Sequence, residues 1–175
     1  MLNYIFLFST GLCLAAAVAY GYSNLFITAP SPENLKTAFE FVILGLKALK
    51  YVEHIDYEVL QEHVQDVGKV VVRVNVYKQH RQTIQYILPT DHVKLAQAEL
   101  VAIDEAAAIP LPVVKKLLGP YTVFMSSTIN GYEGTGRALS LKLINQLRQQ
   151  QGASLMASAQ TAGEEVRAED GVVWR

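Results

Sequence analysis

Cysteine is nearly absent from this chain, in which Cys13 is the only one. This excludes a disulfide framework and a cysteine-rich zinc site. Charge is also sparse, at 18% of residues with a net charge of −1, so a strongly basic surface for nucleic acid does not cover the whole molecule. Hydrophobic residues reach 51% of 175 residues. That composition predicts one packed domain and excludes wholesale disorder.

The beginning of the chain lacks charge altogether, because no charged side chain precedes Glu33. The apolar stretches 4–8 and 12–19 are typical of a signal peptide or a membrane helix, and Ala17-Val18-Ala19 is similar to a small-residue cleavage site. Against targeting, no Lys or Arg precedes the apolar stretch, and Thr10 and Gly11 interrupt it. The alternative is a helix buried in a soluble core, which apolar periodicity does not separate from targeting.

Helical and strand patterns alternate along the rest of the chain. The pattern predicts helices over 10–20, 32–50, 56–64, 110–118 and 137–150. It predicts strands over 24–28, 69–76, 83–87, 100–103 and 123–125. From Gly152 onward no period is evident, and we expect a loose tail. Strands separated by helices favour an α/β fold with a mostly parallel sheet flanked by helices.

The apolar run Leu100-Val101-Ala102-Ile103 ends in two carboxylates, Asp104 and Glu105, and resembles a Walker B element. Parallel sheets bind ligands beyond the carboxyl ends of their strands. Asp104 is therefore a candidate ligand of Mg²⁺, held directly or through water. Glu105 is a candidate to orient or deprotonate the water that attacks a γ-phosphate. The alternative is a strand end with two solvated acids.

Two further segments with residues suited to bind a nucleotide follow the acid pair along the chain. The next apolar strand ends in Ser126-Ser127-Thr128, where hydroxyls are suited to bind phosphate oxygens or the acid pair. The loop 131–136 carries three glycines and precedes a predicted helix that begins at Arg137. Such a loop and helix start attract anions, and Arg137 would add a charge-assisted phosphate contact. The alternatives are an ordinary strand end and a turn with a helix cap.

A third segment, 27–32, joins a strand to a helix start. Its hydroxyls, Thr28 and Ser31, together with the helix N-terminus are suited to contact an RNA phosphate backbone. The alternative is simply a capped helix start, with Ser31 as N-cap and Pro32 in the first turn.

Several long blocks together resemble one family. The blocks are 21–24 (GYSN), 29–35 (APSPENL), 80–87 (HRQTIQYI), 101–112 (VAIDEAAAIPLP) and 127–137 (STINGYEGTGR). In this order they resemble the RNA cytidine acetyltransferases over residues 11–151.

The resemblance implies a RecA-like P-loop NTPase module that uses ATP and Mg²⁺. The resemblance also implies that full-length members use acetyl-CoA to acetylate N4 of cytidine in small-subunit ribosomal RNA and in transfer RNA. Their implied place of action is the nucleolus, inside the nucleus, during assembly of the small ribosomal subunit. Asp104 and Glu105 match the family's Walker B acids, and Arg137 matches an arginine near the nucleotide. RNA and the remaining parts of the full-length enzyme are the implied partners.

The departures from the family pattern are concentrated at the N-terminus. The family has a Gly-rich Walker A loop with Lys-Ser before its first helix, whereas residues 1–10 here contain neither Gly nor Lys. We therefore expect a divergent apolar segment at 1–10, a partial ATPase module at 11–151 that lacks the Walker A strand and loop, and a disordered tail at 152–175. The acetyl-CoA-binding region of the family has no counterpart here.

These departures lead us to expect weak or no ATP hydrolysis from the chain alone. Two alternatives remain. One is a non-catalytic remnant that binds RNA or a partner, and the other is a membrane-anchored or secreted protein that uses residues 1–20.

Overall fold

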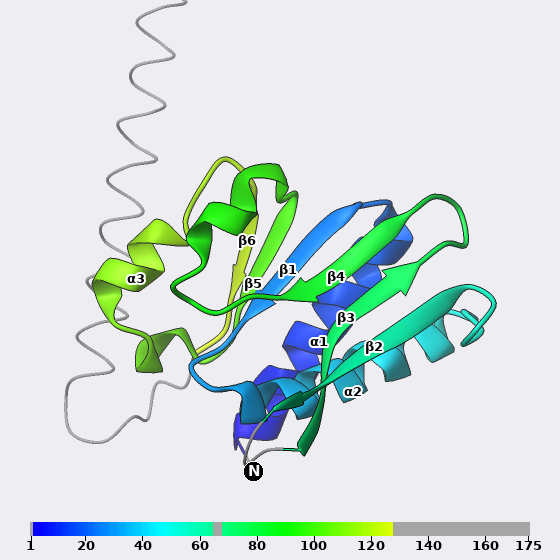
Figure 1. Ribbon diagram of the computed structural model, residues 1–175, viewed down its shortest axis with the longest axis horizontal. Coiled ribbons are helices and arrows are strands. Elements are labelled where there is room, and N and C mark those ends of the chain that lie inside the picture. The colour runs from blue at the N-terminus through cyan, green and yellow to red at the C-terminus, as the bar shows by residue number, and fades with distance from the viewer. Residues whose placement is uncertain (1, 65–67, 128–175) are drawn as a thin grey trace, which may run out of the picture.

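The computed structural model describes residues 2–64 and 68–127 (Figure 1). The helices are α1 (Leu2–Tyr20), α2 (Pro32–Ala48) and α3 (Leu111–Lys116), with short 3-10 helices η1 (His92–Gln97) and η2 (Ala106–Ala108). The strands are β1 (Asn24–Thr28), β2 (Tyr57–Val64), β3 (Gly68–Val76), β4 (Gln82–Tyr86), β5 (Leu100–Ile103) and β6 (Thr122–Met125).

All six strands form one sheet in the order β2-β3-β4-β1-β5-β6. Strands β4, β1, β5 and β6 are mutually parallel, and β2 and β3 join them as an antiparallel hairpin. The predicted α/β class with a mostly parallel sheet is confirmed. The carboxyl ends of four strands consequently share one edge, where parallel sheets place their ligands.

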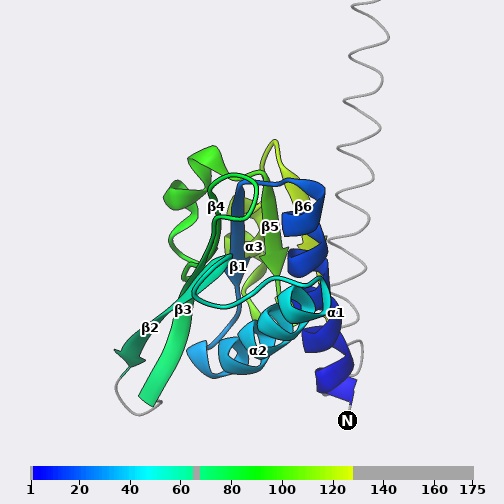
Figure 2. The same ribbon diagram turned by 90° about the vertical axis from the view of Figure 1, so that its right-hand side faces the viewer.

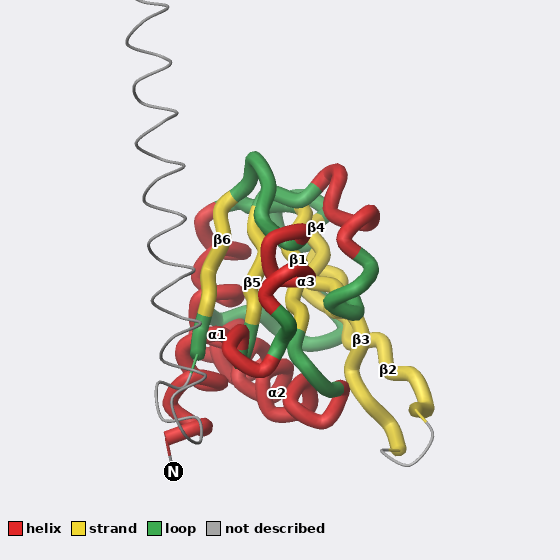
Figure 3. Tube along the Cα trace, turned by 90° about the vertical axis from the view of Figure 1, so that its left-hand side faces the viewer, coloured by secondary structure: helices red, strands yellow, loops and turns green. Residues whose placement is uncertain are grey.

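Helices cover both faces of this sheet (Figures 2 and 3). Helices α1 and α2 lie on one face, and η1, η2 and α3 lie on the other. Strand β5 shows why both faces need cover. Its residues Leu100 and Ala102 belong to the core under α1 and α2, and Val101 and Ile103 belong to the second core. A strand buried on both faces is a continuous apolar run, as this one is.

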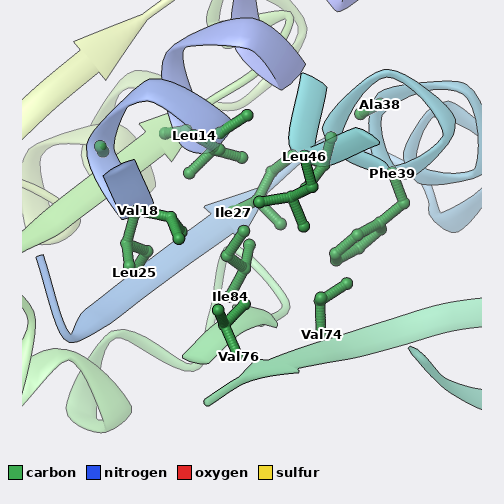
Figure 4. Close-up of a cluster of buried hydrophobic side chains, with 14 of the residues drawn as sticks. Leu14, Val18, Leu25, Ile27, Ala38, Phe39, Leu46, Val74, Val76 and Ile84 are labelled. Carbon is green, nitrogen blue, oxygen red and sulfur yellow. The ribbon is translucent and has the colours of Figure 1, made fainter. Parts of the chain in front are cut away.

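The larger core lies between the sheet and the helices α1 and α2 (Figure 4). Leu14 and Val18 of α1 and Phe39 of α2 meet Leu25 and Ile27 of β1 there. Each of these side chains is at most 1% exposed. Burying one side chain of this kind contributes roughly 1.5–3 kcal/mol, so α1 is held chiefly by its inward face.

Helix α1 begins at Leu2 and continues without a break past residue 10. The sequence predicted that a divergent apolar segment ends at this residue and that the ATPase module begins at residue 11. The helix ends at Tyr20 because Gly21 adopts a φ of 112°, and the Gly21 and Tyr22 N–H groups donate to Ala17 O. The predicted helix over 10–20 is confirmed, and the face that carries Leu14 and Val18 is buried. Within the described ranges, no helix combines the length and apolar character that a bilayer span requires.

The prediction of a helix over 56–64 is wrong. This segment is strand β2, which pairs with β3 from Tyr57 opposite Val76 to Val64 opposite Gly68. Tyr57 is fully buried in the main core. The hydrogen bonds to β3 and the burial of Tyr57 outweigh the local helix preference of the glutamates, because tertiary context overrides propensity.

Candidate active site at the carboxyl edge of the sheet

Asp104 lies at the carboxyl end of β5, is 3% exposed, and accepts hydrogen bonds from two hydroxyls. Ser126 Oγ, just after β6, donates to Asp104 Oδ1 at 2.6 Å. Thr10 Oγ1 of α1 donates to the same oxygen at 3.3 Å, and the two hydroxyl oxygens are 3.1 Å apart. We call Thr10, Asp104 and Ser126 the Asp104 cluster. It joins α1, β5 and β6 at one point.

Backbone hydrogen bonds fix the position of this cluster. The parallel ladder continues one step past the strands, since Asp104 N donates to Thr28 O at 2.9 Å and Ser126 N donates to Ile103 O at 3.0 Å. Ala106 N then donates to Ser126 O at 3.0 Å. The tips of β1, β5 and β6 are thereby tied together, as a preorganised site requires.

Burial dominates the electrostatics of Asp104. Desolvation raises the pKa of this carboxyl, because the charged form loses its hydration. Hydrogen bonds from Ser126, Thr10 and the Glu105 backbone oppose that change and lower the pKa. The group is thus a poorly solvated carboxyl supported by hydroxyl donors, which a bound cation would stabilise in its charged form.

Glu105 follows in a left-handed conformation, with φ of 49° and ψ of 45°. Residues other than glycine, asparagine and aspartate rarely adopt this region, and such strain concentrates at functional sites. The turn directs the chain away from β5 into η2, and Glu105, the residue predicted to orient or deprotonate the attacking water, is at this turn.

The strain at Glu105 predicts that Glu105→Gly stabilises the fold by about 1 kcal/mol, because glycine adopts a positive φ without steric cost. The matched control is Glu105→Ala, which removes the same carboxylate and keeps the strained backbone. Urea denaturation of both variants measures the difference. Equal stability of the glycine and alanine variants would contradict the strain at this position.

Buried hydroxyls without a partner gather at the same edge. Within the described residues, Thr28 Oγ1, Ser127 Oγ and Tyr86 OH have no hydrogen-bond partner. They lie at the carboxyl ends of β1, β6 and β4, respectively. Buried polar atoms are normally paired, and unpaired ones indicate a ligand, an ion or a water. Hydroxyl and carboxylate oxygens are the donor set that suits a hard cation and phosphate groups.

The remaining predicted site residues fall into two groups. Ser31 is the N-cap of α2, as expected, but its side chain makes no capping hydrogen bond. Thr128 and Arg137 lie outside the described residues. The proposed roles of Thr28, Ser31, Ser127, Thr128 and Arg137 stay predictions. Across 2–64 and 68–127, no group of three or more His, Cys, Asp or Glu side chains is placed to hold a metal.

Sequence reasoning misses Thr10, which stands out in the sequence only as an interruption of the apolar stretch. For Ser126 it does better, because hydroxyls suited to bind the acid pair are predicted after the next strand, and Ser126 Oγ donates to Asp104 there. A signal is present, because a polar residue within an otherwise apolar buried helix needs a hydrogen-bond partner. Thr10 is fully buried and finds that partner in the Asp104 cluster.

Removing the hydroxyl of Thr10 is expected to lower the free energy of unfolding by about 1–2 kcal/mol, since hydrogen bonds to charged groups contribute in this range. Thr10→Val tests this, because valine matches the shape of threonine without the donor. Thr10→Ser keeps the hydroxyl and should recover most of the loss. Thermal denaturation of the wild type, Thr10→Val and Thr10→Ser separates the contribution of the hydroxyl group from that of the methyl group. If Thr10→Val is as stable as the wild type, the hydrogen bond does not stabilise the fold, and if only Thr10→Ser is damaging, the methyl contact does.

Comparison with known proteins decides the family. The helicase-domain model of the RNA cytidine acetyltransferases NAT10 and TcmA matches residues 8–172. The chain belongs to the RNA cytidine acetyltransferase family. The match extends beyond the stretch 11–151 over which the sequence blocks predicted it.

Curated relatives of this family are close in sequence. The RNA cytidine acetyltransferase of Saccharomyces cerevisiae is 66% identical over 87% of this chain, and that of Homo sapiens is 67% identical over 85%. The matched region is 14% of either relative, so the chain corresponds to a small part of their length.

The solved structures found by comparison are only weakly similar to this chain. The large terminase ATPase domain of Thermus phage P74-26 is 18% identical, with a TM-score of 0.47 over 69% of this chain and 53% of that one. The large terminase of another thermophilic bacteriophage is 12% identical, with a TM-score of 0.45 over 65% of this chain and 29% of that one.

Proposed function

We propose that this chain forms the acidic half of an ATP site that serves RNA cytidine acetylation. The observation that supports it is the Asp104 cluster, a buried carboxyl at the carboxyl end of a central parallel strand that accepts hydrogen bonds from two hydroxyls. Further buried hydroxyls without partners belong to residues at the carboxyl ends of β1, β4 and β6. Membership of the family's helicase domain supplies the context.

The residues present suit Mg²⁺ and nucleotide phosphate. Asp104 would hold the cation, directly or through water, and Glu105 would orient the attacking water. Ser127, Thr128 and Arg137 would hydrogen-bond the phosphate oxygens. When bound, the cation neutralises charge on the transferring phosphoryl group. Asp104 is already oriented before any ligand arrives, because two hydroxyls fix one of its oxygens.

The wider role follows from the relatives and is part of this proposal. In a full-length protein, ATP turnover at this site would support acetyl-CoA-dependent N4-acetylation of cytidine in small-subunit ribosomal RNA and transfer RNA. Thr28 and Ser31 would contact the RNA backbone. The place of action would be the nucleolus, during assembly of the small ribosomal subunit.

Equilibrium binding of a fluorescent ATP analogue to the full chain, with and without Mg²⁺, tests the nucleotide site. We expect weak binding that depends on Mg²⁺ and is lost in Asp104→Asn. Equal binding in this variant, or none in the wild type, would overturn the proposal. The control variant Glu62→Gln removes an exposed carboxylate on β2, which is the edge strand at the opposite end of the sheet from β6.

Hydrolysis is a separate measurement. We expect little or no ATP turnover, with or without RNA, because residues 1–10 offer no glycine loop and no lysine for the β- and γ-phosphates. Robust turnover that is abolished by Glu105→Gln would contradict this expectation and would show that Glu105 alone activates the water.

The absence of a glycine loop and a lysine in residues 1–10 also favours a second candidate function, a non-catalytic segment that binds RNA. Without a lysine for the phosphates, RNA affinity without nucleotide affinity is the expected behaviour of such a segment. Fluorescence anisotropy of a single-stranded RNA at several salt concentrations distinguishes it. Phosphate contacts make the affinity fall steeply with salt, and an affinity without salt dependence would exclude this candidate.

A further inference from the structure

The outward face of α1 is apolar from Phe8 to the end of the helix. Phe8, Leu12, Ala16, Ala19 and Tyr20 recur about one helical turn apart and are all exposed. Phe8, Leu12 and Tyr20 are 46%, 48% and 84% exposed, respectively. We call these five residues the α1 stripe. No charged side chain occurs anywhere between residues 2 and 20.

The apolar surface continues from α1 onto α2. The rings of Phe8 and Phe41 meet edge to face at 5.3 Å between centroids, and Leu44, three residues after Phe41, is 57% exposed. The opposite side of α1 already fills the main core through Leu14 and Val18. A helix that is apolar on every side is normally covered on every side, and a contiguous exposed apolar patch marks an interaction surface.

The described chain ends beside α1. Ser127 is the last described residue, and its neighbour Ser126 lies 3.1 Å from Thr10 of α1 between their hydroxyl oxygens. Figures 2 and 3 show β6 running alongside α1. Thr10 is two residues from both Phe8 and Leu12 and therefore lies on the buried side of α1, opposite the α1 stripe. The chain thus leaves the sheet next to α1, level with the start of the stripe along the helix axis, and must pass around the helix to reach it.

The sequence that follows Ser127 fits the α1 stripe in length and pattern. Nine residues, 128–136, separate it from the predicted helix 137–150 and span at most about 30 Å. In that segment Leu139, Leu143 and Leu147 recur every four residues, and the other side carries Asn145, Arg148 and Gln149 together with Leu141. Fourteen helical residues measure about 21 Å, and the α1 stripe from Phe8 to Tyr20 measures about 18 Å.

We propose that residues 137–150 form an amphipathic helix that lies along the α1 stripe, with Leu139, Leu143 and Leu147 against Phe8, Leu12 and Ala16. This contact would give α1 a second apolar neighbour and complete the helical layer on that face of the sheet. The proposal does not depend on nucleotide binding.

Cross-linking in the full chain tests the contact. In a Cys13→Ala background, which removes the only native cysteine, Ala16→Cys and Leu143→Cys are combined and treated with a short bismaleimide. A tethered segment has an effective concentration of order millimolar, so at micromolar protein the adduct within one chain should form at least about a hundredfold faster than any adduct between chains. Tryptic peptides identify the linked pair.

The matched control combines Leu143→Cys with Val93→Cys. Val93 lies on η1, on the opposite face of the sheet, and is 78% exposed. This pair should react at least about tenfold more slowly within one chain, since a docked segment has a much lower effective concentration at the far face. Equal rates for the two pairs would show that the segment does not dock. An adduct only between chains would assign the α1 stripe to a second copy, and no adduct would also overturn the proposal.

A second measurement avoids cysteines altogether. Hydrogen exchange of α1 is compared in Leu143→Glu and Asn145→Glu, which add the same charge to opposite sides of the predicted helix. Faster exchange across residues 12–20 is expected in the first variant only. Unchanged exchange in both, or an equal increase in both, would contradict docking through Leu143.

Discussion

Gly11→Val is expected to lower the free energy of unfolding by about 3 kcal/mol, at the upper end of typical overpacking costs. A Cβ at position 11 would lie 2.5 Å from Phe41 Cβ and 2.9 Å from both Ala38 O and Val42 N. Two of these three atoms belong to the backbone of α2, which cannot rotate away as a side chain can. Helix α1 would have to separate from α2, and Thr10 would be drawn away from Asp104.

Urea denaturation of Gly11→Val against Ala19→Val measures this effect. Ala19 lies on the exposed face of the same helix, so the control carries the helix-propensity cost of valine without the collision. A Gly11 variant that is no less stable than the control would mean that the two helices are not in contact at this position. The Mg²⁺-dependent affinity for the ATP analogue should fall together with stability, because Thr10 is adjacent to Gly11.

Asp104→Asn is expected to change stability in the opposite direction and to raise the free energy of unfolding at pH 7.5 by about 1–2 kcal/mol. Substitutions that relieve a destabilised site commonly have such an effect. Burial raises the pKa of Asp104, so the folded state binds this proton more tightly than the unfolded state does. Stability from this group is complete below the unfolded pKa of about 3.8 and is lost as the pH rises through the higher folded pKa. Asparagine does not titrate and escapes that loss.

The difference between the variant and the wild type should therefore grow from about pH 4 to pH 7.5 and vanish in acid. Denaturation curves at several pH values provide the measurement, with Glu62→Gln as the control, since Glu62 is an exposed acid on the far edge strand β2. A difference that does not change with pH would show that Asp104 remains charged throughout this range. A lower stability of Asp104→Asn at pH 7.5 that is absent in acid would show that the charged form is required by its hydroxyl neighbours.

The strands of the site can be predicted because their signals are local. The apolar run 100–103 is bounded by acids, and the run 24–28 is followed by Pro30 and Pro32, so both strands are predicted with the bounds that the structure has. Strand β2 is not predicted, because its structure depends on pairing with β3 and on the burial of Tyr57. Local patterns carry no record of such a partner.

The candidate site also contains residues that can be predicted from local sequence and a residue that cannot. Asp104 and Glu105 are identified from a few neighbouring residues and do lie at the carboxyl edge of the sheet. Ser126 is anticipated as well, because a run of hydroxyl residues follows the next strand. Thr10 is harder to foresee, because it is 94 residues from Asp104 and 116 from Ser126 in the sequence. Contacts across such separations arise from the crossover connections of a parallel sheet, and no spacing rule in one sequence predicts which side chains they bring together.

The hydrogen bonds that continue past β1, β5 and β6 have a mechanical consequence. Asp104 N is anchored to Thr28 O, and Ser126 is held from both sides by Ile103 O and Ala106 N. A group that pushes on any one of these three tips must displace the other two or break a backbone bond. A ligand that engages Ser127 beyond β6 would thus shift the carboxylate beyond β5 without touching it.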